Sequence, residues 1–153
     1  MRFLPGVATI VALALAGSAF AQSSANHQVS VSIPTVLRLR IDEHVASDHA
    51  TVNVSIRVEG ALRTIDPAST RLEVSANTAW QLSVSYTSTV DDSGLVLSWH
   101  ALGNSDVLHG SPTVVATGHS TGGWRAVHVD YGVVNEPADG DYQGLIAYTL
   151  ARP

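Results

Sequence analysis

The sequence predicts an all-β protein, an antiparallel sandwich of about nine strands that follows a leader segment. Three observations point to this fold class. Apolar and polar residues alternate with a period of two in many short runs, and clusters of Gly, Pro, Asp and Ser separate these runs. After the leader, no segment shows a helical period of useful length. Short strands in close succession, each with one apolar and one polar face, are typical of antiparallel sheets.

Residues 1–21 are predicted to be a secretory signal peptide. Arg2 supplies a basic start, Val7 to Ala16 form an apolar stretch, and Ala19-Phe20-Ala21 is a small-residue cleavage site. The apolar stretch is too short to span a bilayer, which needs roughly 20 residues. We expect cleavage after Ala21 and no membrane span in the remaining chain. The remaining 132 residues, 22–153, form a single domain large enough to be stable without disulfides, and the sequence has no Cys.

The predicted strands follow from the alternation, taken in chain order. They are residues 27–33 (Val29, Val31 and Ile33 on the apolar face), 35–41 (Leu37, Leu39, Ile41), 51–58 (Val52, Val54, Ile56, Val58), 70–76 (Leu72, Val74, Ala76), 79–86 (Trp80, Leu82, Val84, Tyr86), 94–100, 113–117, 125–131 and 142–150.

Turn residues set the boundaries of these strands. Pro34 separates the first two because it cannot donate to a sheet ladder, and Asp66-Pro67 opens a turn. Asp92-Ser93-Gly94 is typical of a hairpin loop. Longer polar stretches at 103–112, 118–123 and 135–141 are predicted to be loops. The whole pattern predicts an immunoglobulin-like sandwich.

The charge of the chain excludes two classes of partner. Without Arg2, seven Arg stand against thirteen acidic residues, which gives a formal net charge of −6, and there is no Lys. Nucleic acids and anionic lipid surfaces are bound by basic patches, so neither is an expected partner.

Two aromatic-x-Leu triplets stand out, "WQL" in mid-chain and "YTL" near the end. Residues i and i+2 of a strand share a face, so Trp80 and Leu82 point the same way, as do Tyr148 and Leu150. Both pairs continue the inward side of their strands. We therefore interpret them first as core residues that anchor two strands.

Together with the ending "GDYQGLIAYTLARP", these triplets resemble the WxL domain of bacterial surface proteins. That family has one W-x-L in mid-domain and a second in a terminal strand that begins with Gly-x-Tyr; here Tyr148 stands where the family has the second Trp. The resemblance implies a secreted β-sandwich held non-covalently at the cell surface or cell wall. Peptidoglycan is the implied partner and Trp80, Leu82, Tyr148 and Leu150 are the motif residues.

Trp124 is the candidate for an exposed binding aromatic. It follows the glycine pair 122–123 and precedes Arg125. An aromatic ring at the end of a loop can stack on a sugar, and a neighbouring Arg can bind a carboxylate. The alternative is that Trp124 caps one end of the sandwich.

Catalytic and metal sites are not expected. The sequence has no Cys and no G-x-S-x-G nucleophile elbow, and we predict a non-enzymatic protein without cofactors. The seven His residues are widely spaced for zinc: His27, His44, His49, His100, His109, His119 and His128. The acidic loop with Glu136, Asp139 and Asp141 leaves calcium binding open beside a solvated turn.

Two functions remain open at this point. The first is non-covalent attachment to the envelope, or to another surface protein, in a secreted, wall-bound or periplasmic setting. The second is a structural subunit of a fimbria or coat that self-assembles by strand addition, with residues 27–33 as the added strand.

Overall fold

The computed structural model describes residues 31–41, 44–89 and 94–153, and it is all-β. The predicted signal peptide and residues 27–30 of the first predicted strand lie outside the described residues. The strands are β1 (Leu37–Ile41), β2 (His44–Ala46), β3 (His49–Glu59), β4 (Leu62–Asp66), β5 (Ser69–Ala76), β6 (Trp80–Ser88), β7 (Leu97–Ala101), β8 (Asn104–Val107), β9 (Thr113–Gly118), β10 (Arg125–Val133) and β11 (Gly140–Ala151).

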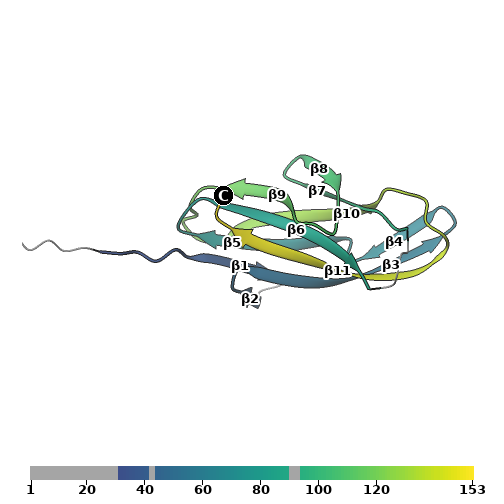
Figure 1. The fold of residues 1–153 in the computed structure, drawn as a ribbon, viewed down its shortest axis with the longest axis horizontal. Coiled ribbons are helices and arrows are strands. Elements are labelled where there is room, and N and C mark those ends of the chain that lie inside the picture. The colour runs from purple at the N-terminus through teal and green to yellow at the C-terminus, as the bar shows by residue number, and fades with distance from the viewer. Residues whose placement is uncertain (1–30, 42–43, 90–93) are drawn as a thin grey trace, which may run out of the picture. The chain divides into compact units, whose positions relative to one another are not determined.

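The strands form two facing antiparallel sheets (Figure 1). Sheet A has the order β2-β1-β5-β10-β7-β8 and sheet B the order β4-β3-β11-β6-β9. Every strand pair is antiparallel. The predicted antiparallel sandwich is therefore confirmed, while the finer immunoglobulin-like arrangement stays a prediction.

The core lies between the sheets and consists mainly of the inward residues that the alternation predicts, together with Leu108 from the predicted loop 103–112. Strand β6 alternates between buried and half-buried positions from Trp80 to Tyr86, and β11 does so from Gly144 to Tyr148, with Thr149 exposed before buried Leu150. The largest fully buried side chains are Trp80, Tyr148, Leu39, Ile56, Leu72, Leu82, Leu97, Ile146 and Leu150. Burial of such side chains stabilises a fold by about 1.5–3 kcal/mol each, before the entropy cost of ordering the chain is subtracted.

A glycine next to the largest aromatic explains how the core closes. Gly118 of β9 is paired with Trp80 of β6. A Cβ at position 118 would lie only 2.5 Å from Cζ2 of Trp80, so a larger residue there would displace the indole ring. The ring thus occupies the space that the absence of a side chain leaves free.

Three strands were not expected, and one expected strand is absent in its described part. Strands β2, β4 and β8 are only three to five residues long, and β4 and β8 have no buried residue, so they lack the alternation that identifies the other strands. Strand β8 lies within the predicted loop 103–112. Residues 31–36, which include the end of predicted strand 27–33, are not in a strand.

Candidate functional site

The two triplets meet on adjacent strands of sheet B. Leu150 of β11 is paired with Leu82 of β6, and Tyr148 is paired with Val84. The exposed fraction is 0% for Trp80, Leu82 and Tyr148 and 2% for Leu150. The Trp80 indole donates a hydrogen bond of 2.9 Å from Nε1 to the carbonyl oxygen of His119. The four motif residues are therefore core residues, and none of them presents a surface to a ligand.

Trp124 lies at the surface, immediately before β10. Its exposed fraction is 38%, and the Arg40 guanidinium carbon lies 4.6 Å from the centroid of its ring. Arg40 belongs to β1, which is separated from β10 in sheet A by β5. This cation–π contact holds the indole against the outer face of the sheet, the face turned away from sheet B.

Glu73 holds Arg40 in that position. The Arg40 guanidinium forms an ion pair with the Glu73 carboxylate, whose side chain is only 20% exposed. Arg71 approaches the other carboxylate oxygen of Glu73 at 3.6 Å. Because Arg40 and Glu73 are directly opposite on β1 and β5, the contact needs no distortion of either strand.

Arginines outnumber acids around Trp124. Arg38 and Arg40 alternate on the outer side of β1, and Arg71 and Glu73 on the outer side of β5. We call Trp124, Arg38, Arg40, Arg71 and Glu73 the Trp124 patch; its formal charge is +2. The chain as a whole carries −5, so the patch is locally basic on an acidic protein. Chemically it offers an aromatic ring and planar guanidinium donors, which suit a carboxylate-bearing sugar.

Arg125 follows Trp124 directly in the sequence, but it does not belong to the Trp124 patch. In the β5–β10 ladder it is paired with Val74, and it shares the side of β10 that carries buried Val127 and Val129. It is exposed because it stands at the first position of the strand. The arginine that contacts the indole is Arg40, which a residue-by-residue interpretation of the sequence misses because the pairing depends on strand order.

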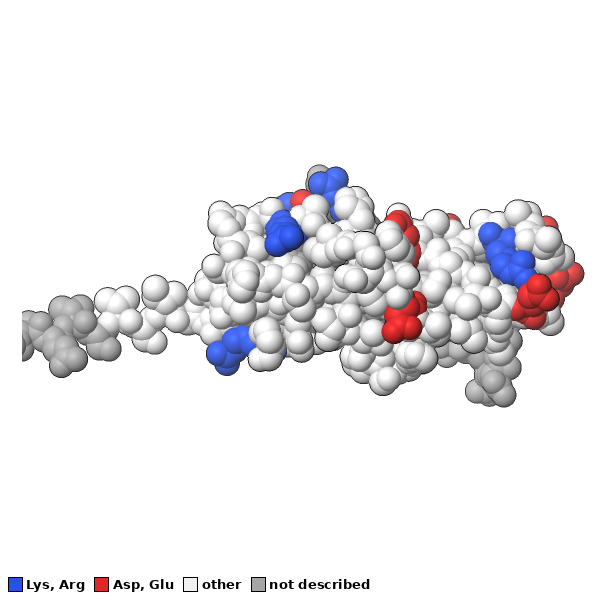
Figure 2. Space-filling view, turned by 90° about the horizontal axis from the view of Figure 1, so that it is seen from above, with Lys and Arg blue, Asp and Glu red and all other residues white. Residues whose placement is uncertain are grey.

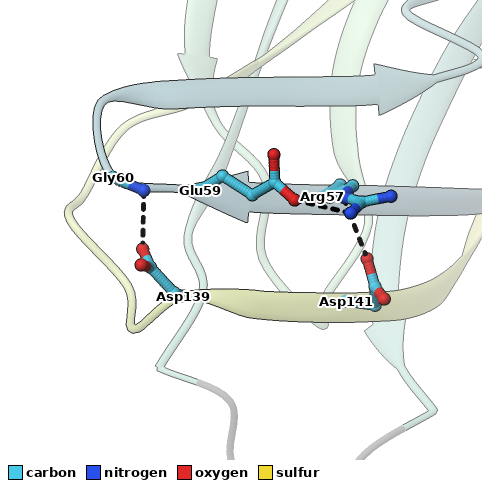
Figure 3. A network of polar contacts seen from close by, with 5 residues as sticks. All are labelled: Arg57, Glu59, Gly60, Asp139 and Asp141. Atoms are coloured by element: carbon cyan, nitrogen blue, oxygen red, sulfur yellow. Dashed lines mark hydrogen bonds and ion pairs between the residues drawn. The ribbon is translucent and has the colours of Figure 1, made fainter.

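The acidic loop stabilises a hairpin (Figure 3). Gly60, at the tip between β3 and β4, donates its N–H to Asp139 Oδ1 at 2.8 Å. Arg57 Nε donates to Glu59 Oε1 at 2.8 Å and lies 3.9 Å from Asp141 Oδ1. Glu136 is exposed and takes no part in the network drawn. The carboxylates of Asp139, Glu59 and Asp141 thus each have a partner in the protein. These contacts favour a structural turn over a calcium site.

The histidines do not converge. In the part of the chain that the structure describes, no group of three His, Asp or Glu side chains is placed to hold a metal ion. Hydrogen bonds from His49 and Ser47 lower the pKa of Asp48 below its ordinary value. His100 lies 3.7 Å from Asp130 on the neighbouring strand, and His128 is exposed. His27 lies outside the described residues.

Shallow depressions mark the outer face of sheet B. One of about 340 Å³ is lined by Asn53, Val54, Ser55, Thr89, Gln143 and Gly144, and another of about 290 Å³ by Ser55, Ile56, Arg57, Thr64, Asp66, Asp141, Tyr142 and Gln143. The Tyr142 ring is half-buried, and its hydroxyl donates to the carbonyl oxygen of Ala138. These depressions therefore offer polar groups without the exposed ring that Trp124 provides.

Comparisons with protein-family models, with curated proteins and with solved structures return no match for this chain. The described residues contain no helix long and apolar enough to cross a membrane.

Proposed function

We propose that the protein is a secreted, non-enzymatic domain of the bacterial cell surface that attaches non-covalently to the envelope, with peptidoglycan as its ligand. The observation that supports this proposal is the Trp124 patch. It joins an exposed indole to guanidinium groups on the outer face of sheet A, where Arg40 contacts the ring and both Arg40 and Arg71 approach Glu73. The resemblance to the WxL domain supports the same function, although here its motif residues act through the core.

The charge distribution agrees with an anionic ligand at this patch. Figure 2 shows the densest group of acidic side chains at the end of the sandwich where β3 and β4 meet, on the right of the view. The Trp124 patch lies on sheet A, around the paired positions Arg40 and Glu73. A polymer with carboxylates would be attracted to the patch and repelled by the acidic end.

A binding measurement with the insoluble polymer tests the proposal. Residues 22–153 are sedimented with purified peptidoglycan over a range of salt concentrations. We expect binding that weakens with salt but persists, because salt screens the arginine contacts and leaves ring stacking. Trp124→Ala should weaken binding roughly tenfold, about 1.4 kcal/mol, without loss of the fold.

Val134→Ala is the matched control, because Val134 is a 55% exposed apolar residue outside the patch. It should bind as the wild type does. Unchanged binding by a folded Trp124→Ala variant would show that the patch is not the site. A stable wild-type monomer that does not sediment with the polymer would contradict peptidoglycan as the ligand and leave a surface protein as the partner.

A further inference from the structure

Two branched apolar residues near the start of the described chain are left uncovered. Val31 and Ile33 are 76% and 78% exposed, and they belong to the alternating sequence of residues 27–33. In that sequence Ser30 and Ser32 separate Val29, Val31 and Ile33, the pattern of a strand with one buried face. Exposed apolar residues in such a pattern are typical of a surface that a partner covers.

The sandwich offers four edge strands, and three of them are protected. Sheet A ends in β2, with three residues, and in β8, with four residues that include Asp106. Sheet B ends in β4, which carries Arg63 and Asp66. Shortness and charge are two of the means by which proteins prevent another strand from pairing with an edge.

The fourth edge, β9, lacks both features. It has six residues, Thr-Val-Val-Ala-Thr-Gly, none of them charged, and Val114 is 44% exposed. A bulge at Val115 interrupts its ladder with β6, since the pairing passes from Leu82–Ala116 to Ser83–Val114. The bulge bends the strand at Val115, and the ladder continues on both sides of it, at Thr113–Val114 and at Ala116–Gly118.

We propose that residues 27–33 of one copy add as a strand to the β9 edge of a second copy. Neither segment contains Asp, Glu, Lys or Arg, so pairing buries no unpaired charge. Val31 and Ile33 would extend the apolar side that β9 forms with buried Val115 and Ala116, and Ser32 would share the exposed side of Thr117. The added strand would form main-chain hydrogen bonds with the outward N–H and C=O groups of β9.

A second copy is favoured over the same copy as the donor because Ile33, within the unit of residues 33–153, is 78% exposed and is not covered by its own sandwich. A contact between the tail of one copy and the edge of the next joins two different surfaces, so it repeats into an open chain of copies. This inference goes beyond wall attachment and does not rest on it.

Cysteine crosslinking tests the contact directly, since the chain has no Cys of its own. Ser32→Cys is mixed with Thr117→Cys under mild oxidation, and in parallel with Thr64→Cys on β4 and Ser105→Cys on β8 as edge controls. We expect a disulfide-linked heterodimer to form at least tenfold faster with Thr117→Cys than with either control. The double substitution Val31→Asp with Ile33→Asp, in the Ser32→Cys chain, should abolish this preference while the fold is kept.

Two outcomes would overturn the proposal. One is equal crosslinking at all three edges, or none at the β9 edge. The other is a chain carrying both Ser32→Cys and Thr117→Cys that forms only an internal disulfide and stays monomeric in sedimentation velocity. Binding to peptidoglycan is measured separately with the wild type, so failure of the wall-attachment proposal is distinguishable from failure of this one.

Discussion

At the scale of single residues, two buried tyrosines differ in the partner of their hydroxyl group. Tyr131 donates a hydrogen bond of 2.8 Å to Thr70 Oγ1, the buried polar residue at the start of β5. The hydroxyl of Tyr148 is buried and has no hydrogen-bond partner among the described residues. A buried polar group without a partner costs free energy that a hydrogen-bonded one recovers. Tyr148 therefore contributes to the core through its ring.

The two tyrosines give opposite predictions on removal of the hydroxyl. Tyr148→Phe should leave the free energy of unfolding unchanged or raise it by about 1 kcal/mol, because the fold loses an unsatisfied group. Tyr131→Phe should lower it by about 1–2 kcal/mol, since Thr70 loses its partner. Urea unfolding of both variants measures the difference. A Tyr148→Phe variant that is the less stable of the two would show that the hydroxyl has a partner in solution.

At the scale of elements, the hairpin of β3 and β4 is tied to the loop before β11. The tie is the hydrogen bond from Gly60 N–H to Asp139, and Gly60 has a positive φ of 56°, which favours glycine at the tip. The loop that suggested a calcium site thus fixes the end of sheet B.

Asp139 can be tested by a matched pair of substitutions. Asp139→Ala removes the acceptor and should lower the free energy of unfolding by about 0.5–1 kcal/mol, because water partly replaces the bond. Asp139→Asn keeps an acceptor oxygen and should cost less than about 0.5 kcal/mol. Calcium titration followed by thermal unfolding is the accompanying control. A calcium-dependent rise in the melting temperature, lost in Asp139→Asn, would restore the metal hypothesis.

The long strands of the sandwich can be predicted from the sequence, and the short edge strands cannot. Eight of the nine expected strands are present because each of them turns a row of apolar residues into the core. Strands β2, β4 and β8 are short pieces at the sheet edges, where neither a long run nor a buried face marks them. Which strands pair with each other, and in which sheet, depends on contacts between distant parts of the chain. The period of the apolar residues does not encode these contacts.

At the scale of the whole molecule, the candidate site depends on strand order. The alternation that turns Leu37, Leu39 and Ile41 inward leaves Arg38 and Arg40 on the outer side of their strand, and the glycine pair 122–123 indicates that Trp124 lies at a loop end. It did not show that β5 lies between β1 and β10, which brings Glu73 beside Arg40 and Arg40 beside Trp124. The sequence therefore predicts Arg125 as the arginine beside Trp124, whereas the arginine that contacts the ring is Arg40.

The pH dependence of stability is also a property of the whole molecule. Burial raises the pKa of the Tyr131 phenol above its ordinary value, so the folded state keeps a proton that the unfolded state releases above about pH 10. The contribution of Tyr131 to the free energy of unfolding is fully present below about pH 10. Above that pH it falls by about 1.4 kcal/mol per pH unit, until the pH reaches the pKa of the phenol in the folded state. Urea unfolding between pH 9 and 11.5 should show this fall, and Tyr131→Phe should reduce the slope. An unchanged slope in the variant would assign the alkaline transition to other groups.

Tryptophan fluorescence provides the most direct test that Trp124 is the ligand-contacting residue. Trp80 and Trp99 are 0% and 4% exposed, so the indole that an aqueous quencher reaches is that of Trp124. Acrylamide quenching is measured with and without soluble peptidoglycan fragments, with Trp124→Phe as the control. We expect the fragments to reduce quenching in the wild type and to have no effect in the variant. Fragments that bind while the quenching of Trp124 stays the same would contradict the account.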